Sequence, residues 1–183
     1  MHFSAVILAG GNSSRMGRDK AWLEVGGQTL LARQLQLARQ LGAAEIFISG
    51  RADTDYSRFG CPVLRDTFAQ AGPLAGVERA LAAATTPMLL VLAVDLPDMN
   101  VDFLRRLAAD CSPTCGAIPQ LAGQVEPLAA FYPKSAYPLV LSNLECGRLA
   151  ARYFARQCVA AGMARVIEIE ESEARCLRNC NEP

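Results

Sequence analysis

Apolar runs alternate with amphipathic segments along this chain, and the alternation predicts its fold class. Residues 3–9 and 88–94 are almost continuously apolar, as is typical of strands that are buried on both faces of a sheet. Residues 29–41 instead repeat leucine and alanine at helical spacing, and Gly42 follows where that helix would end. Strands that alternate with helices in this way predict an α/β protein, a three-layer α/β/α sandwich around a mostly parallel sheet.

Shorter segments extend the same pattern. Residues 114–118 and 127–131 are expected to form two strands joined by a turn at Gly123, and the tail from 172 to 183 is polar. Because we find no repeat and no low-complexity linker, we expect residues 1–183 to form one domain. The remaining expected elements are strands at 45–49, 62–64 and 164–169, and helices at 72–84, 101–109, 136–144 and 148–161.

The carboxyl ends of the predicted strands carry glycines and charged residues. In open α/β sheets, ligands bind in the crevice beyond these strand ends. We therefore expect four segments to border a single crevice: the glycine-rich loop that follows the first strand, residues 49–51, residues 65–66 and residues 94–95.

The glycine-rich loop, LAGGNSSRMGRDK at 8–20, has the chemistry of a polyphosphate site. Gly10 and Gly11 allow backbone amides to approach an anion closely, and Arg15 and Lys20 add two positive charges. Neither G-x-x-x-x-G-K-[ST] nor G-x-G-x-x-G is present, so neither a P-loop NTPase nor a standard dinucleotide binder is indicated. The alternative interpretation is a surface loop without a ligand.

Two carboxylates follow predicted strands. Asp95 comes directly after a buried strand, and Mg²⁺ near a polyphosphate usually takes one or two carboxylates plus phosphate oxygens. Its alternative role is to cap the helix that begins near Val101, although Asn100 is better placed for that. Asp66 either contacts a nucleotide hydroxyl or base, or closes an Asx turn. The following GPLAG stretch, 72–76, brings a helix N-terminus close, which favours an anion.

The composition excludes several classes of function. Eighteen basic and eighteen acidic residues balance, so the chain has no electrostatic footprint for nucleic acid or an anionic membrane. The one histidine, His2, lies at the end of the first strand, which speaks against Ser-His-Asp and Cys-His catalysis. Nucleotidyl transfer needs no histidine, because a phosphate monoester nucleophile is already ionised.

The sequence also predicts where the protein works. The longest apolar run is seven residues, whereas a membrane helix needs about 20, and no signal-peptide pattern opens the chain. The seven cysteines are an odd number at irregular spacing, so we expect reduced thiols in a cytoplasmic protein. Cys111/Cys115 and Cys176/Cys180 have C-x3-C spacing that a zinc site tolerates, but no histidine or third pair supports one.

The chain resembles a known family in five places. LAGGNSSRMGRDK is similar to the signature L-A-x-G-x-[SG]-x-R-[ML]-G-x-x-K of the nucleotidyltransferase superfamily, which has a Rossmann-like fold. Four features resemble the molybdenum cofactor guanylyltransferases: the LAGG form of this loop with D-K at its end, R-D-T followed by GPLAG at 65–76, V-D-L-P at 94–97, and EPLAAFYPK at 126–134. The tail NCNEP, at 179–183, is similar to the N-x-N-T-P that closes the family's sequences. The resemblance therefore spans nearly the whole chain.

The resemblance implies a reaction and its residues. The terminal phosphate of the molybdenum–molybdopterin cofactor would attack the α-phosphorus of GTP in the presence of Mg²⁺, giving the guanine dinucleotide cofactor and pyrophosphate. It also suggests hand-over to cofactor-insertion proteins or molybdoenzymes. The residues it implies are Leu8, Ala9, Gly10, Gly11 and Asp66 at the nucleotide, Arg15 and Lys20 at its phosphates, and Asp95 with Asn181 at Mg²⁺, with Arg15, Lys20 and Asp95 taking part in catalysis.

The chain departs from the family pattern at two positions. It has Ser49-Gly50-Arg51 where an asparagine is frequent at the end of the second strand, and Glu182 where threonine is usual. No motif assigns the pterin contacts; Arg148 and Arg152, on the helix expected after Gly147, either bind an anion or form a solvated face. The alternatives are a CTP-using or sugar-1-phosphate nucleotidyltransferase, and a relative that binds nucleotide or cofactor without catalysis.

Overall fold

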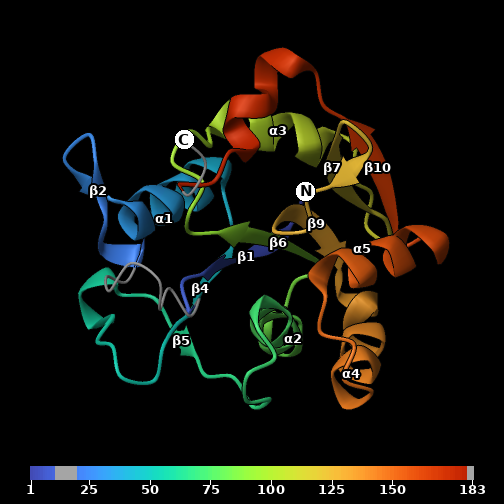
Figure 1. The fold of residues 1–183 in the computed structure, drawn as a ribbon, viewed down its shortest axis with the longest axis horizontal. Helices are drawn as coiled ribbons and strands as arrows, with labels where there is room; N and C mark the ends of the chain where they lie inside the picture. Colours follow the sequence, from blue (N-terminus) through green and yellow to red (C-terminus); the bar gives the residue numbers. More distant parts are fainter. Residues whose placement is uncertain (11–19, 181–183) are drawn as a thin grey trace.

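A computed structural model describes residues 1–10 and 20–180 of the protein, and it contains the expected α/β sheet (Figure 1). The order of the main sheet is β5-β4-β1-β6-β9. The first four strands are parallel and β9 is antiparallel to β6, which confirms a mostly parallel sheet. The strands are β1 (Phe3–Leu8), β4 (Glu45–Ser49), β5 (Val63–Leu64), β6 (Met88–Ala93) and β9 (Ala129–Pro133).

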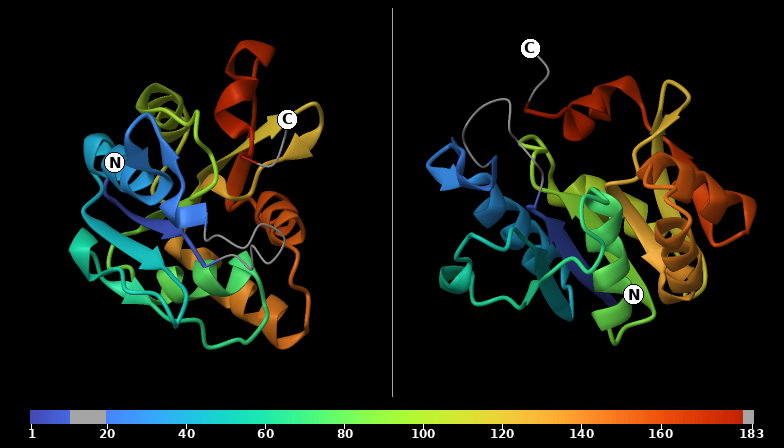
Figure 2. Two further views of the ribbon diagram at one scale, coloured as in Figure 1. Left: turned by 60° about the vertical axis from the view of Figure 1, so that its left-hand side comes forward. Right: turned by 60° about the horizontal axis from the view of Figure 1, so that its bottom comes forward.

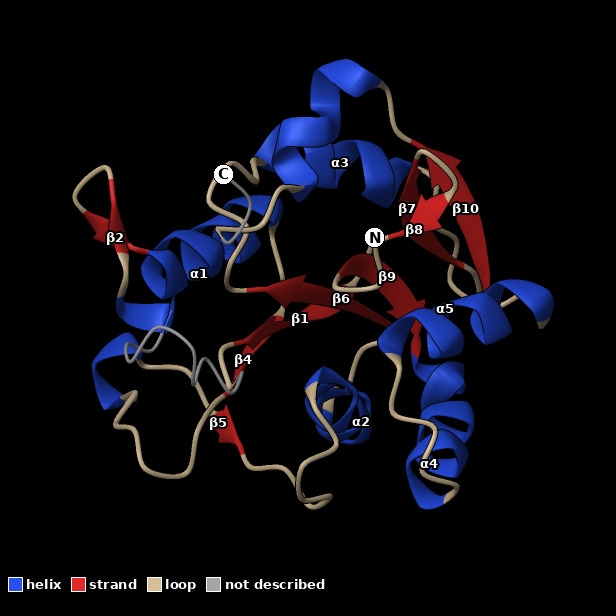
Figure 3. Cartoon of the chain, in the orientation of Figure 1, coloured by secondary structure: helices blue, strands red, loops and turns tan. Residues whose placement is uncertain are grey.

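Helices cover both faces of this sheet, as the three-layer prediction requires (Figures 1 and 3). On β1, Phe3, Ala5 and Ile7 pack into the core under α1 and α3, whereas Val6 and Leu8 pack into the core under α2, α4 and α5. This alternation is the expected result of burying a strand on both faces. The helices are α1 (Leu30–Leu41), α2 (Pro73–Ala83), α3 (Val101–Ala109), α4 (Tyr137–Glu145) and α5 (Ala151–Ala160).

A second sheet, of order β10-β7-β8, lies beside β9, and it corrects one prediction. The turn at Gly123 joins β7 to the two-residue strand β8, and the expected pairing of 114–118 with 127–131 is wrong. Pro127 has no N–H to continue the hairpin, and the chain instead enters the main sheet against β6. The strands of this sheet are β7 (Gly116–Leu121), β8 (Gln124–Val125) and β10 (Ala164–Glu168).

The two sheets meet at Gly116. A Cβ atom at this position would overlap the carbonyl oxygen of Phe131 in β9. The absence of a side chain therefore allows β7 to cross β9 at close range.

The C-terminal third differs from the sequence-based expectation in two further ways. Helix α5 begins at Ala151, so Arg148 lies before it in a turn, where its N–H donates to the Asn143 carbonyl at 2.8 Å. The polar tail contains the 3-10 helix η4 (Glu171–Leu177), which lies against α3 (Figures 1 and 2). The apolar pair Cys176 and Leu177, within an otherwise polar segment, is buried in the core there.

Another departure is a small hairpin near the N-terminus. The strands β2 (Glu24–Val25) and β3 (Gln28–Thr29) form it, and it projects from the molecule ahead of α1 (Figure 1). Two-residue strands carry too little periodicity for a sequence pattern to detect.

No helix in the described part of the chain has the length and apolar character to cross a lipid bilayer. All seven cysteines are free thiols. Within residues 1–10 and 20–180, no three potential metal-binding side chains of the His, Cys, Asp or Glu type come together.

Candidate active site

A pocket of about 510 Å³ lies beyond the carboxyl ends of the parallel strands. Its size is within the range of about 300–1,000 Å³ that is typical of small-molecule sites. All four predicted strand ends contribute to it, which confirms that they border one crevice. The contributing residues are Leu8, Ala9 and Gly10 after β1, Ser49 at the end of β4, Asp66 after β5, and Ala93, Val94 and Asp95 after β6.

An ion pair stands in the wall of this pocket. The Lys20 ammonium nitrogen lies 2.8 Å from a carboxylate oxygen of Asp95, and 16% and 22% of the two side chains are exposed. Lys20 opens the 3-10 helix η1 (Lys20–Trp22), and Asp95 follows β6. The fold therefore places an ammonium group beside a carboxylate in the wall of the pocket, a combination that suits a phosphate group together with a divalent cation.

Helix α1 holds the segment that carries Asp95. The side-chain amide of Gln34, which is fully buried, donates to the Leu96 carbonyl at 2.7 Å. The Arg33 guanidinium donates to the Pro97 carbonyl at 2.8 Å. Two adjacent polar side chains thus hold the carbonyl groups of the two residues that follow Asp95, which restrains the backbone that carries its carboxylate.

Asp95 itself does not cap α3. The N-cap is Asn100, whose side-chain oxygen accepts a hydrogen bond from the Phe103 N–H at 2.9 Å. The Asp95 carbonyl accepts from the N–H of Cys180 at 3.1 Å, which brings the C-terminal segment to the pocket. The Asp95 carboxylate therefore lines the pocket, where its partner is the Lys20 ammonium, and does not serve as a helix cap.

An aromatic stack holds the segment that carries Lys20. The ring of Trp22 is stacked on Tyr56, with centroids 6.0 Å apart and an interplanar angle of 12°, and it lies 5.7 Å from the ring of Phe59. The guanidinium carbon of Arg58 lies over the Trp22 ring, 4.3 Å from its centroid. This cluster attaches η1 to the loop that follows β4, and it adds stacking and cation–π attraction to the buried area.

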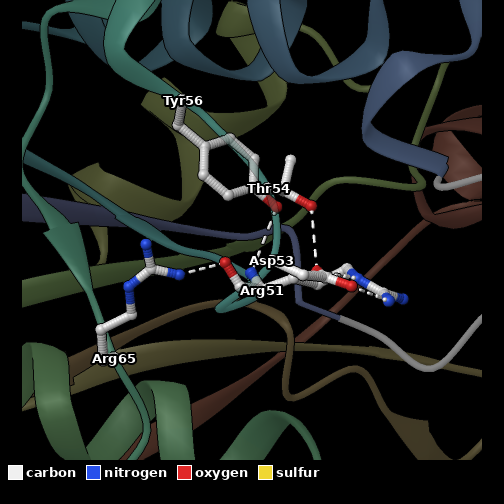
Figure 4. Close-up of polar contacts among 5 residues, drawn as sticks. All are labelled: Arg51, Asp53, Thr54, Tyr56 and Arg65. Carbon is white, nitrogen blue, oxygen red and sulfur yellow. Dashed lines mark hydrogen bonds and ion pairs between the residues drawn. The ribbon is translucent and has the colours of Figure 1, made fainter.

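The loop after β4 is ordered by a polar network (Figure 4). The Arg51 side chain binds both carboxylate oxygens of Asp53, at 2.9 and 2.8 Å, and these hydrogen bonds hold the pKa of that carboxyl below its usual range. The Arg51 N–H donates to the Tyr56 hydroxyl at 3.2 Å, and Arg65 donates to the Arg51 carbonyl. Ser49, at the end of β4, lines the pocket, whereas Arg51 is not among the described residues that line it.

Asp66 reaches the pocket from the other side. Burial of its carboxyl, and then the charge of the buried Glu78 on α2, raises the pKa of Asp66 above its ordinary value. Within the described residues the carboxylate has no hydrogen-bond partner, so it closes no Asx turn. Gly72 and Pro73, at the N-terminus of α2, also line the pocket and bring their end of the helix dipole to it.

The donor set fits Mg²⁺ that is shared with a substrate. Asp95 is a single carboxylate, and Mg²⁺ is commonly held by one or two carboxylates together with substrate phosphates. Burial, and then the nearby Asp95 carboxylate, raises the pKa of the Cys180 thiol above its ordinary value. The residues present therefore suit a hard cation bound jointly with phosphate oxygens.

Three of the candidate residues, Gly11, Arg15 and Asn181, lie outside the described residues. The structure brings together the other six, Leu8, Ala9, Gly10, Lys20, Asp66 and Asp95, in one pocket. Sequence reasoning missed the supporting residues Gln34, Trp22 and Tyr56. Gln34 had a detectable signal, because a polar residue at spacing four from Leu30 interrupts the apolar face of α1.

Comparisons with known proteins agree with this architecture. The family model for the MobA-like NTP transferase domain matches residues 5–161. A probable molybdenum cofactor guanylyltransferase from Opitutus terrae is 38% identical over 183 aligned positions, and the alignment covers 98% of this chain and 91% of the relative.

Solved structures share the fold. Molybdopterin-guanine dinucleotide biosynthesis protein A from Archaeoglobus fulgidus gives a TM-score of 0.77 at 22% identity, over 98% of this chain and 93% of that one. The 2-C-methyl-D-erythritol 4-phosphate cytidylyltransferase from Thermus thermophilus gives a TM-score of 0.73 at 24% identity. The match covers 100% of this chain and 94% of that one. Since a guanine-linked and a cytidylyl protein share this fold, the fold alone does not determine the base.

Proposed function

The chain belongs to the family of MobA-like NTP transferase domains, and from this premise we propose that it transfers GMP from GTP to the terminal phosphate of molybdenum–molybdopterin. The nucleotidyltransferase class follows from the family. The guanylyl donor and the pterin acceptor are supported by the name of the Opitutus relative and by the motif resemblance across the chain. The products are the guanine dinucleotide cofactor and pyrophosphate.

The observation that carries the proposal is the Lys20–Asp95 ion pair inside a pocket formed by four strand ends. A triphosphate that enters this pocket meets backbone groups at Leu8 to Gly10, the N-terminus of α2 and the Lys20 ammonium. Arg15 would add a second positive charge from the glycine-rich loop. Each of these groups favours negative charge, and together they favour a nucleoside triphosphate over a neutral ligand.

The reaction needs alignment and charge neutralisation more than acid–base catalysis. An oxygen of the acceptor phosphate forms a bond to the α-phosphorus, and the bond from that phosphorus to the bridging oxygen of the β-phosphate breaks. The electron pair leaves on pyrophosphate, and no proton has to be removed from the ionised nucleophile. We infer that Lys20 neutralises the charge that develops on the leaving group, since it lines the pocket from η1.

We assign Mg²⁺ to Asp95, with Asn181 as a further ligand. When bound, the ion supplies a Lewis acid and neutralises phosphate charge. Asp95 contributes a carboxylate whose backbone is fixed by Arg33 and Gln34, so the ligand is held in place before the substrate arrives. Asp66 lines the pocket with a carboxylate that can accept a hydrogen bond from a nucleotide hydroxyl or base.

The proposed setting is the cytoplasm. Seven free thiols are consistent with a reducing compartment. The proposed product is a cofactor, so we infer that cofactor-insertion proteins or molybdoenzymes receive it.

Thermal unfolding with Mg²⁺ and each of GTP, CTP, ATP, UTP and dTTP tests the donor. A ligand at about 100 times its Kd adds about 2.7 kcal/mol of stability. For a chain of this size each kcal/mol raises Tm by about 2–4 °C, so GTP is expected to raise it by about 5–11 °C and the other nucleotides by clearly less. A larger shift with CTP or dTTP would move the protein to a cytidylyl or sugar-phosphate branch, and no shift with any nucleotide would contradict the proposal.

A further inference from the structure

Tyr56 lies between two parts of the pocket wall. Its side chain is 1% exposed, and its ring packs against the backbone of Gly50, where a Cβ atom would overlap the ring. Another neighbour is the Trp22 ring, which is stacked on it with centroids 6.0 Å apart and an interplanar angle of 12°. Gly50 directly follows Ser49, which lines the pocket, and Trp22 ends the 3-10 helix that Lys20 opens. One buried ring therefore connects the end of β4 to the segment that carries Lys20.

The place of this ring is specified by its own loop. The Tyr56 hydroxyl accepts a hydrogen bond from the Arg51 N–H at 3.2 Å (Figure 4). Gly50 and Arg51 lie in the stretch at which the chain departs from the family pattern, and the absence of a side chain at Gly50 leaves room for the ring. Stacked aromatic rings attract each other beyond the area that they bury, so the stack with Trp22 holds the two segments together.

We propose that Tyr56 is a positioning residue for Lys20, and that it acts through Trp22 to set the place of the Lys20 ammonium in the pocket. The inference rests on the proposed function, since it concerns the group that neutralises the leaving pyrophosphate. Neither aromatic residue is among the described residues that line the pocket, so both act on transfer through residues that do. The fully buried Ala21 attaches the same short helix to the core, and the stack adds a second attachment.

The stack fixes a flexible side chain at its base. The ammonium of a lysine ends a flexible four-carbon stem, so its place in the pocket depends on the backbone from which it starts. In the structure the Lys20 ammonium lies 2.8 Å from a carboxylate oxygen of Asp95. A misplaced charge loses most where charge develops during the reaction, whereas the triphosphate in the ground state meets several other groups of the pocket. Loss of the stack is therefore expected to lower kcat more than the affinity for GTP.

The substitution Gly50→Ala tests the proposal from the side of β4. The added methyl group overlaps the Tyr56 ring, and Gly50 is not among the glycines with positive φ, so the variant displaces the ring without backbone strain. The matched control is Ala52→Ser, which also adds one heavy atom, at an exposed position of the same loop. We expect kcat to fall about tenfold in Gly50→Ala, with a smaller change in the Kd of GTP, and Ala52→Ser to behave like the wild type.

Two substitutions of the rings themselves extend the test. Trp22→Leu breaks the stack from the side of Lys20 and leaves β4 unchanged, so kcat is expected to fall as it does in Gly50→Ala. Tyr56→Phe is the conservative variant, because it keeps the ring and removes only the hydroxyl. It is expected to retain most of kcat.

Two further readouts separate positioning from a general loss of structure. The chain has one tryptophan, so its fluorescence reports on the stack, and the emission of Gly50→Ala is expected to differ from that of the wild type and of Ala52→Ser. Combined with Lys20→Ala, Gly50→Ala is expected to cause no further loss of kcat, because the group that it displaces is absent.

Three results would overturn the inference. They are an unchanged kcat in Gly50→Ala, an equal loss of kcat in Ala52→Ser, and a full further loss of kcat when Gly50→Ala is combined with Lys20→Ala. Failure of the proposed function is distinguishable from all three, because the wild-type protein itself would then transfer no GMP.

Discussion

Asp95→Asn is expected to lower kcat by about 10²- to 10³-fold while the protein remains folded. The substitution removes one negative charge and keeps the shape of the side chain, so the proposed Mg²⁺ ligand is lost without a cavity. Losses of this size are typical when one group that stabilises transition-state charge is removed. The free energy of unfolding is expected to fall by about 1–3 kcal/mol, because Lys20 loses its carboxylate partner in a largely buried pair while the Asn side chain can still accept a hydrogen bond.

Pyrophosphate release measured with saturating GTP and acceptor checks this expectation. Asp98→Asn is the matched control, since Asp98 is an exposed carboxylate three residues further on and is not among the described residues lining the pocket. Wild-type turnover in Asp95→Asn would remove this carboxylate from the mechanism. Turnover lost equally in both variants would indicate a general effect of charge in this segment.

Lys20→Ala is expected to slow turnover more than it weakens nucleotide binding. In the ground state the triphosphate charge is shared among several groups, including the N-terminus of α2, so the Kd of GTP is expected to rise by less than about tenfold. In the transition state additional charge develops on the leaving pyrophosphate, and loss of the ammonium is expected to lower kcat by about 10²-fold.

Comparing kcat with the Kd of GTP separates these two effects. Lys20→Arg should recover part of the rate, because it keeps the charge but changes its shape and hydration. A variant in which the Kd of GTP rises while kcat is unchanged would show that Lys20 acts in binding alone. The same variants, with Tm measured as well, test whether the salt bridge between Lys20 and Asp95 is only structural. If it is, Asp95→Asn and Lys20→Ala are expected to lower Tm by the same amount and to retain full activity.

The strand ends were the most predictable part of the molecule. Residues 45–49 and 101–109 form a strand and a helix with the expected bounds, because dense apolar patterning and an Asn100 cap leave few other conformations. Parallel topology then dictates that the strand ends meet, and six candidate residues lie in one pocket as a result. Their chemical roles remain predictions.

Long-range contacts were less predictable. Trp22 and Tyr56 stack although 34 positions separate them, and no spacing rule relates residues on two loops. Gln34 was detectable as a polar residue in an apolar stripe, but its partner, a backbone carbonyl at Leu96, carries no signature in the sequence. The position of β9 was missed because local alternation does not say which neighbour a strand pairs with.

The most direct test of the central claim is to follow label from α-³²P-GTP into molybdenum–molybdopterin in the presence of the protein and Mg²⁺. We expect the label to appear in the pterin dinucleotide, with one pyrophosphate released for each label transferred and little transfer from α-³²P-CTP. Binding of GTP without transfer of label would identify a non-catalytic relative, and preferential transfer from CTP would identify a cytidylyl enzyme; either result would contradict the proposed function.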